Sequence, residues 1–192
     1  MSRKGSDRDV LIIDDAFPAA SCARVVTAMN SGTPEVAEVL DDTSAPDVAV
    51  RRASHIDVDA ATFALLDACL DSHRARIEQF FGVALNEREG VSLLRYRAGD
   101  FFRRHRDWGV VASWPDAARR RISLVLFLTT SRDVRETGTF SGGALRLFDE
   151  EGHIAREVYP EAGRLVAFPS TVLHEVLPVG DGTRDAVVDW FY

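Results

Sequence analysis

Cysteine is scarce in this sequence, with only Cys22 and Cys69 among 192 residues. Two cysteines can form neither a disulfide framework nor a four-cysteine zinc site, so any metal site has to use histidine, aspartate or glutamate. The scarcity is compatible with a reducing compartment, and we expect a cytoplasmic protein.

Long apolar runs are also missing. No stretch approaches the roughly 18 apolar residues that cross a membrane. Residues 1–9 are polar and charged and have no apolar core of a secretion signal. We therefore expect no membrane partner, a disordered lead-in at residues 1–9 and a single domain over residues 10–192, a size that one hydrophobic core supports.

An excess of positive charge is absent as well, because the formal net charge is −7 at pH 7. Binding to nucleic-acid phosphates needs a basic surface, so we expect no nucleic-acid partner. The local basic runs at residues 103–106 and 119–121 are interpreted as solvated faces and ion pairs.

The first half of the chain shows mixed helical, strand and loop patterns. Residues 10–14 predict a strand, residues 18–29 a helix, residues 35–46 a loop and residues 48–58 a loosely alternating strand. The strongest helical pattern covers residues 59–81, with Asp59 as the expected N-cap and Gly82 as the end.

From Gly90 onward the pattern changes to short apolar strands separated by turn residues. Eight strands are expected, at residues 91–96, 101–105, 121–129, 144–148, 154–159, 164–168, 172–179 and 184–191. Short strands at this spacing are typical of an antiparallel jelly roll or barrel. We therefore predict a mainly β protein of the α+β class, in which two preceding helices pack on one face of a jelly roll.

A candidate metal site lies at the end of the second of these strands. His105 and Asp107 are two residues apart, so in an extended strand their side chains share one face. His174, on the penultimate strand, is the best candidate for a third ligand. The other histidines fall in a helix, in a turn and outside the strand-rich half: His73, His153 and His55. Two imidazoles and a carboxylate on one face of an octahedral ion leave three positions open, which suits iron(II) oxygenases.

Arg184 favours the metal interpretation. It follows the glycine-rich turn at residues 180–182 and opens the last strand. If that turn closes a hairpin, His174 faces Val187, and Arg184 lies about 10 Å further along the strand. From there a guanidinium could grip the far carboxylate of a five-carbon diacid that chelates the ion.

The last strand alternates in a way that suits a ligand. Arg184, Ala186, Val188 and Trp190 share one face, and the two small side chains leave room beside the arginine. Tyr96 could add a hydroxyl donor to the same carboxylate, although a core aromatic is an equally good interpretation.

Each of these residues also has a plain structural interpretation. A His-x-Asp pair arises often by chance, and a lone histidine in a strand is more often a hydrogen-bonded core residue than a ligand. Arg184 could instead form a surface ion pair with Asp181 or Asp185, which would contribute little to stability.

Three segments carry a resemblance to a known family. They are Tyr96-x-x-Gly99-x-x-Phe102-x-x-His105-x-Asp107, then Ser141-Gly142-Gly143-Ala144-Leu145-Arg146-Leu147-Phe148, then His174-x-Val176-x-Pro178-Val179-x-x-Gly182-x-Arg184 followed by Trp190-Phe191. Together they resemble the prolyl 4-hydroxylase-like family of iron(II)- and 2-oxoglutarate-dependent dioxygenases. The resemblance runs over nearly the whole chain, and the combination of motifs is far more specific than any one of them.

The resemblance implies a double-stranded β-helix that uses iron(II), 2-oxoglutarate and dioxygen, with ascorbate as a reductant and release of succinate and CO2. It implies iron ligands at His105, Asp107 and His174, a 2-oxoglutarate anchor at Arg184 assisted by Tyr96, and a pocket wall at Trp190. Phe102 departs from the family, since many members have tyrosine there. Asp107 fills the position that related halogenases leave open for halide, so the expected reaction is hydroxylation of an unactivated C–H bond.

The substrate is not identified by these residues. We expect a free amino acid or a small natural-product intermediate first, and a prolyl residue second. The expected contacts lie in the loops at residues 35–46, 110–120 and 131–140. Candidate substrate contacts are Trp108 and Trp114 as apolar walls, and Arg103, Arg119 and Arg120 as partners for a substrate carboxylate.

Two other classes of protein remain open. A cupin-like metal enzyme that does not use 2-oxoglutarate would need the ion but not Arg184. A non-catalytic jelly-roll binding module would need neither the ion nor the cosubstrate.

Overall fold

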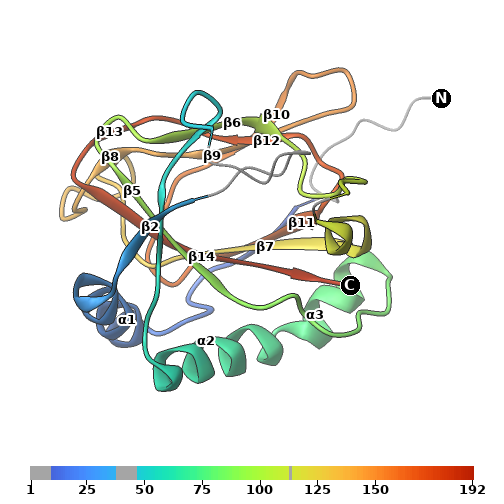
Figure 1. Cartoon of the computed structure of the whole chain (residues 1–192), viewed down its shortest axis with the longest axis horizontal. Helices are drawn as coiled ribbons and strands as arrows, with labels where there is room; N and C mark the ends of the chain where they lie inside the picture. Colours follow the sequence, from blue (N-terminus) through green and yellow to red (C-terminus); the bar gives the residue numbers. More distant parts are fainter. Residues whose placement is uncertain (1–9, 38–46, 113) are drawn as a thin grey trace.

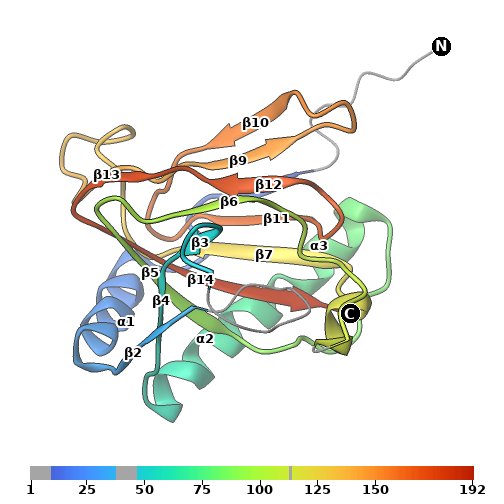
Figure 2. The same ribbon diagram turned by 45° about the horizontal axis from the view of Figure 1, so that its top comes forward.

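The computed structural model describes residues 10–37, 47–112 and 114–192. The expected lead-in at residues 1–9 and most of the expected loop at residues 35–46 lie outside these ranges. The described chain forms two facing β-sheets, with helices on the outer side of the larger sheet (Figure 1, Figure 2). This is the mainly β architecture, with helices on one face, that the strand pattern predicts.

The larger sheet has seven strands in the order β1-β11-β7-β14-β5-β4-β2. Their bounds are β1 (Leu11–Ile13), β11 (Leu165–Pro169), β7 (Ile122–Phe127), β14 (Thr183–Phe191), β5 (Ser92–Arg97), β4 (Ser54–Ile56) and β2 (Pro34–Val36). Neighbouring strands in this order pair antiparallel. Strand β7 is buried along its whole length, because one face lies under the helices and the other under the second sheet.

The smaller sheet has five strands in the order β10-β9-β12-β6-β3. Their bounds are β10 (Ile154–Val158), β9 (Leu145–Phe148), β12 (His174–Val176), β6 (Phe101–His105) and β3 (Arg51–Arg52). A separate pair joins β13 (Val179–Asp181) to β8 (Ser141–Gly142). The strand expected at residues 172–179 is therefore interrupted at Pro178, which has no backbone N–H to donate to a ladder.

Three helices cover the larger sheet: α1 (Ala19–Ser31), α2 (Ala60–Ser72) and α3 (Arg74–Phe81). The helix expected over residues 59–81 starts as predicted, because the Asp59 carboxylate accepts a hydrogen bond of 2.8 Å from the Thr62 backbone N–H. It divides at His73, and Gly82, with a φ of 66°, ends α3. No helix in the described part of the chain is long and apolar enough to cross a membrane.

The hydrophobic core has two layers, which follow from strand alternation. The outer layer packs the helices on the larger sheet and includes Val25, Met29, Leu66, Leu70, Leu124 and Leu126. The inner layer fills the space between the sheets and includes Val125, Phe127, Leu145, Leu147, Val166 and Phe168. Leu124 and Val125 are neighbours in sequence, so consecutive residues of one strand serve the two layers.

Two local strand predictions need correction. Glu35 and Val36, expected in a loop, belong to β2, because their backbone pairs with β4. The strand expected at residues 48–58 splits at Ala53. Its first part, β3, pairs with β6 of the smaller sheet, and its second part, β4, pairs with β5 of the larger sheet.

The hairpin expected between His174 and Val187 is also wrong. His174 pairs with β6 and β9 in the smaller sheet, whereas Val187 pairs with β5 and β7 in the larger sheet. The chain changes sheets at β13, which pairs with β8 instead. His174 and Arg184 therefore belong to opposite sheets and approach each other across the space between them.

Candidate active site

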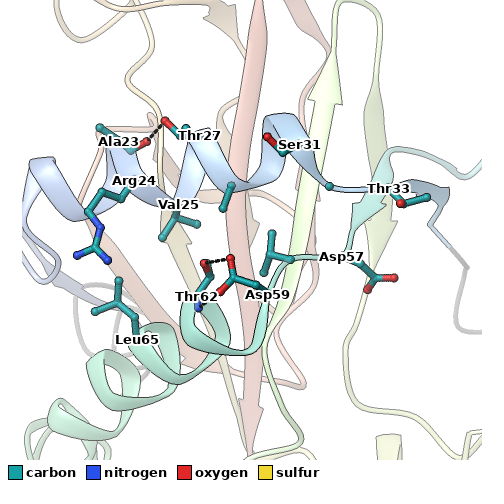
Figure 3. A pocket seen from close by; sticks show the side chains of 13 residues that line it. Ala23, Arg24, Val25, Thr27, Ser31, Thr33, Asp57, Asp59, Thr62 and Leu65 are labelled. Atoms are coloured by element: carbon teal, nitrogen blue, oxygen red, sulfur yellow. Dashed lines mark hydrogen bonds between the residues drawn. The ribbon is translucent and has the colours of Figure 1, made fainter.

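The structure has a broad groove and a small cavity. The groove, about 790 Å³, lies between α1 and α2 and is lined by Arg24, Asp57 and Asp59 among others (Figure 3). Asp59 is already used as the helix cap, and no histidine or cysteine is among the described residues that line this groove. The cavity, about 120 Å³, lies between the two sheets and gathers the titratable side chains.

All six site residues expected from the sequence line this cavity. They are Tyr96, His105, Asp107, His174, Arg184 and Trp190. The other histidines lie elsewhere: His55 on β4, His73 between α2 and α3, and His153 in the turn between β9 and β10. Five of the six residues come from four separate strands and Asp107 follows β6, and this convergence makes the cavity the candidate active site.

His105, Asp107 and His174 form a compact group. The His105 Nε2 lies 3.5 Å from Asp107 Oδ1, and the His174 Nε2 lies 3.6 Å from Asp107 Oδ2. The ligand atoms of the three residues all lie within 4.8 Å of one another. Strands β6 and β12 bring the two histidines together, since His105 and His174 are paired directly across the ladder.

A β-bulge in β6 sets the direction of His105. His174 pairs with His105 and Val176 pairs with Phe102, so three steps along β6 oppose two steps along β12. The bulge turns Phe102 and His105 toward the same face, although residues three apart in a regular strand point to opposite faces. The two rings stack with their centroids 3.5 Å apart and their planes 15° apart, which fixes the imidazole.

Both imidazoles have Nε2 atoms whose lone pairs can bind a metal. The Nδ1–H of His105 donates to the Arg103 carbonyl at 2.8 Å, and that of His174 donates to the Val172 carbonyl at 3.0 Å. A neutral imidazole that donates through Nδ1 carries its lone pair on Nε2. The two Nε2 atoms are also the atoms that face Asp107.

The charge states suit a divalent cation. Burial and the nearby His105 lower the pKa of His174 to about 4, so this ring is neutral at pH 7. Burial alone would raise the pKa of Asp107, but His174, His105 and the Ser123 hydroxyl hold it well below its usual range. The group therefore offers one carboxylate and two imidazole nitrogens, an oxygen and nitrogen donor set that iron(II) accepts.

Arg184 is a buried cation in the same cavity. Arg184 is 2% exposed, and its Nε has no hydrogen-bond partner among the described residues. The guanidinium carbon lies 4.9 Å from the centroid of the Tyr96 ring. Burial lowers the pKa of Arg184, and the nearby Tyr96 and Asp185 offset only part of this effect.

The alternative of a surface ion pair at Arg184 is excluded by the neighbouring carboxylates. Asp185 points away and accepts two hydrogen bonds of 2.8 Å from Arg95. Asp181 is paired with Arg132 at the surface. Both candidate partners of Arg184 are thus committed elsewhere, and its guanidinium faces the cavity.

Gly143, in the Gly-Gly segment noted in the sequence, makes room for Arg184. A Cβ atom at Gly143 would lie 2.9 Å from the Arg184 Cδ, closer than real Cβ atoms approach other carbons. Gly143 also has a φ of 66°, which disfavours any side chain. The glycine is therefore required by its contact with the arginine as well as by its backbone.

Trp190 forms one wall of the cavity, and Arg120 holds its ring in place. The Arg120 guanidinium lies 3.7 Å above the Trp190 ring and donates to the Asp107 backbone carbonyl at 3.2 Å. Glu89 holds this guanidinium with a 2.6 Å bond from Arg120 Nε, and also accepts from the Trp114 indole at 3.3 Å. Arg120 is thus used to fix the wall and is not a free partner for substrate.

The other candidate substrate contacts differ in their position relative to the cavity. Trp114 lines the cavity, whereas Trp108 is 42% exposed and its indole donates to the Ala118 carbonyl. Arg119 is paired with Glu87 and Asp116. Arg103 donates to the Ala49 carbonyl.

Two charged residues of the cavity lining were not expected from the sequence. Arg51 of β3 pairs directly with Phe102 and shares its inward face, and Arg106 lies between the two predicted ligands His105 and Asp107. Arg51 had no local signal, because only strand pairing brings β3 beside β6.

Comparison with known proteins agrees with this geometry. Residues 91–192 match the model of the 2OG-Fe(II) oxygenase superfamily. A PKHD-type hydroxylase of Shewanella sp. strain ANA-3 is 35% identical over 96 residues, which cover 50% of this chain and 39% of that protein. One from Xanthomonas campestris pv. campestris is 35% identical over 121 residues, covering 60% and 50% of the two chains. This chain thus spans half or less of the length of these relatives.

Solved structures extend the similarity to nearly the whole chain. A prolyl-4-hydroxylase of Pseudomonas putida superposes with a TM-score of 0.70 at 26% identity, over 95% of this chain and 91% of that one. A prolyl hydroxylase of Trichoplax adhaerens, solved with a peptide fragment of a hypoxia inducible factor, superposes with a TM-score of 0.76 at 19% identity, over 96% and 84%. The fold is therefore the double-stranded β-helix, and the chain belongs to the 2OG-Fe(II) oxygenase superfamily.

Proposed function

We propose that this protein is an iron(II)- and 2-oxoglutarate-dependent hydroxylase. His105, Asp107 and His174 would hold the iron, and Arg184 with Tyr96 would hold the distal carboxylate of 2-oxoglutarate. The observation that carries the proposal is a buried guanidinium with no carboxylate partner among the described residues, in the same cavity as a converging His-Asp-His group.

The described residues fit both groups. Three donors from one side of an octahedral ion leave three positions, two for the chelating end of 2-oxoglutarate and one for dioxygen. The planar guanidinium of Arg184 matches a carboxylate in a bidentate manner. When bound, iron and 2-oxoglutarate supply the oxidising chemistry, in which substrate, 2-oxoglutarate and dioxygen give hydroxylated substrate, succinate and CO2.

The protein contributes binding, orientation and exclusion of water. The two imidazoles present Nε2 atoms toward Asp107, whose carboxylate would offset one of the two positive charges of the ion. Arg184 would orient 2-oxoglutarate by its far end, while Leu145, Val176 and Val188 keep the cavity wall apolar. Ascorbate is the proposed reductant that returns iron to the ferrous state.

Asp107 favours hydroxylation over halogenation. A halide would need the coordination position that this carboxylate would occupy. Mass spectrometry of the product formed in excess chloride should therefore show an added oxygen atom. A dominant chlorinated product would contradict the assignment of Asp107 as an iron ligand.

The proposed substrate is a free amino acid, a small natural-product intermediate or a prolyl residue. The names of the similar proteins support the last of these, and the small cavity with Arg51 and Arg106 in its lining supports a compact polar substrate. The loop at residues 110–120 supplies Trp114 and Arg120 to the lining, whereas no described residue of the loop at 131–140 contributes. A succinate-release screen across amino acids, peptides and biosynthetic intermediates would identify the class.

The decisive experiment for the proposed function is Arg184→Ala. We expect this substitution to weaken 2-oxoglutarate binding about a hundredfold, because two charge-assisted hydrogen bonds to a shielded carboxylate are lost. Iron affinity should stay unchanged, since Arg184 is not a ligand. Anaerobic titration of 2-oxoglutarate into the iron-loaded protein, followed by the visible absorption band of the complex, measures the affinity.

Matched variants make the result specific. Arg184→Lys should recover part of the affinity, because it keeps the charge and loses the fork. Arg132→Ala removes an arginine from the surface pair with Asp181 and should behave as wild type. Iron binding with wild-type 2-oxoglutarate affinity in Arg184→Ala would favour the cupin-like enzyme, and a wild-type protein that binds neither group would favour a non-catalytic binding module.

A further inference from the structure

Two buried serine hydroxyls form a chain that ends on Asp107. Ser123, on β7, and Ser170, directly after β11, are 1% and 0% exposed. The Ser123 Oγ lies 2.6 Å from Asp107 Oδ2 and 3.0 Å from the Ser170 Oγ. Neither serine was singled out from the sequence, and neither lines the cavity.

The direction of this chain follows from counting donors. An ionised carboxylate can only accept, so the single hydroxyl hydrogen of Ser123 is donated to Asp107 Oδ2. Ser123 then has no hydrogen left, and the bond between the serines must be donated by Ser170. A hydrogen-bonded chain in which each donor polarises the next is stronger than two isolated bonds.

Ser170 also holds the backbone beside Asp107. Its carbonyl accepts from the N–H of Asp107 at 3.1 Å and from the N–H of Trp108 at 2.9 Å. Its own N–H donates to the Arg121 carbonyl at 2.9 Å. One residue thus fixes the main chain of Asp107 and, through Ser123, one of its two carboxylate oxygens.

We propose that Ser123 and Ser170 are positioning residues that reserve Asp107 Oδ1 for the iron by occupying Oδ2. The inference rests on the proposed function. An iron ion with three protein ligands and chelating 2-oxoglutarate has one position left for dioxygen. A carboxylate that bound through both oxygens would fill that position, so a hydrogen bond that engages Oδ2 keeps it open.

The test compares Ser123→Ala with wild type in two anaerobic measurements. Cobalt(II) absorption in the visible range reports the coordination number, and the visible band of the iron complex reports 2-oxoglutarate binding. We expect Ser123→Ala to keep metal affinity within a few-fold and to change the cobalt spectrum. It should also weaken 2-oxoglutarate binding about tenfold, because an Asp107 that binds through both oxygens would leave the metal only two open positions, and the chelating cosubstrate would have to take both of them.

Three further variants separate positioning from a purely structural role. Ser123→Thr keeps the hydroxyl and should restore the wild-type spectrum. Ser170→Ala should change the spectrum in the same direction by a smaller amount, and it serves if Ser123→Ala does not fold. Ser131→Ala is the matched control, because Ser131 is also 0% exposed and its hydroxyl donates at 2.8 Å to a carboxylate, that of Asp133, away from the cavity.

The outcomes distinguish this inference from the proposed function. Folded Ser123→Ala and Ser170→Ala variants with the wild-type cobalt spectrum and wild-type 2-oxoglutarate affinity overturn the positioning role while the function stands. A wild-type protein whose iron complex gives no band with 2-oxoglutarate overturns the proposed function, and the positioning role with it. Equal spectral changes in Ser131→Ala would attribute the effect to general loosening and also overturn the inference.

Discussion

Gly143 controls how closely the backbone approaches Arg184. A Cβ atom there would lie 2.9 Å from the Arg184 Cδ and 3.2 Å from the Val179 Cγ2. We predict that Gly143→Ala weakens 2-oxoglutarate binding at least about tenfold, because the arginine has to move away from its position in the cavity. A tenfold loss of affinity corresponds to about 1.4 kcal/mol of binding free energy. Iron affinity should be unchanged, and the anaerobic titration measures both.

Gly152→Ala is the control for the strain of alanine in a left-handed conformation. Gly152 has a φ of 83° but nothing within 4 Å of an added Cβ. This variant should lose stability from strain and keep wild-type 2-oxoglutarate affinity. Wild-type affinity in Gly143→Ala as well would mean that Arg184 tolerates the displacement, against the prediction.

The site residues divide into those that the sequence could reveal and those that it could not. His105, Asp107 and Arg184 stand in motifs whose spacing and chemistry are visible along the chain, and the structure brings them to one cavity. Ser123 and Ser170 are ordinary strand and turn serines. Their role depends on which residues the fold places beside Asp107, and that pairing has no local signature.

At the scale of single elements, most strand positions after Gly90 were predictable, whereas strand partners were not. Strand β6 has the bounds expected from its alternation, Phe101–His105, but its bulge is defined only by pairing with β12. The expected hairpin at residues 180–182 failed for the same reason, since a glycine-rich turn does not determine which sheet the next strand joins. The helix expected over residues 59–81 was correct in its ends and wrong in its continuity at His73.

Arg120 links several elements around the cavity wall, because it contacts Trp190 on β14 and the segments that carry Glu89 and Trp114. We predict that Glu89→Gln lowers the free energy of unfolding by about 3 kcal/mol, because it leaves the buried Arg120 without its counter-charge. Denaturant unfolding measures the change. Glu87→Gln is the matched control: Glu87 pairs with Arg119 at the surface, and its loss should cost about 1 kcal/mol or less. Equal losses in the two variants would contradict a buried, structural pair.

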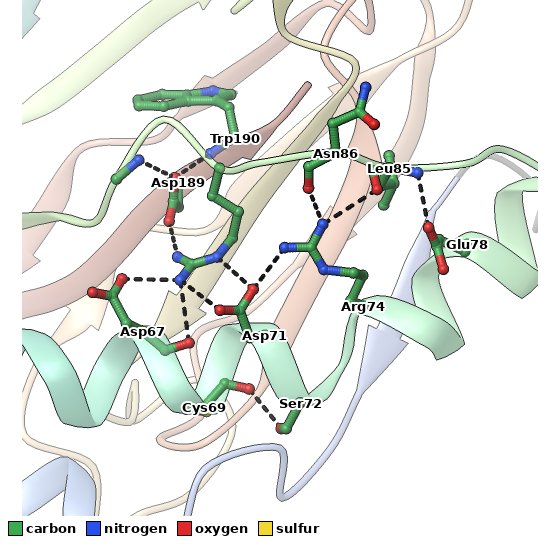
Figure 4. Close-up of polar contacts among 12 residues, drawn as sticks. Asp67, Cys69, Asp71, Ser72, Arg74, Glu78, Leu85, Asn86, Asp189 and Trp190 are labelled. Carbon is green, nitrogen blue, oxygen red and sulfur yellow. Dashed lines mark hydrogen bonds and ion pairs between the residues drawn. The ribbon is translucent and has the colours of Figure 1, made fainter.

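A second network ties the helices to the larger sheet behind this wall. Arg88 binds Asp67 and Asp71 of α2 and the buried Asp189 of β14, the neighbour of Trp190 (Figure 4). Trp190 is thus fixed from the cavity side by Arg120 and through its backbone neighbour by Arg88. No described residue of α2 lines the cavity, yet the helix supports one wall of it through this contact.

At the scale of the whole molecule, the two halves of the site belong to different sheets. The proposed iron ligands come from β6, the segment after it and β12, on the side of the smaller sheet. Arg184 and Tyr96 come from β14 and β5 of the larger sheet. Iron would therefore join strands within one sheet, whereas 2-oxoglutarate would bridge the two sheets.

Because the metal and 2-oxoglutarate would contact different sheets, we predict that each raises the free energy of unfolding by a separate increment. Manganese(II), used as a redox-stable substitute for iron, should raise the free energy of unfolding by about 2.7 kcal/mol at a concentration of about a hundred times its Kd. Saturating 2-oxoglutarate should then add a comparable increment, because it binds only the folded, metal-loaded protein.

Arg184→Ala should keep the first increment and lose the second, and His174→Ala should lose both. Glutarate, which lacks the 2-oxo group and cannot chelate, should add little to the wild type. Denaturant unfolding in each condition measures the increments, and a 2-oxoglutarate increment in Arg184→Ala equal to that of wild type would show that the cosubstrate does not bridge the sheets through this arginine.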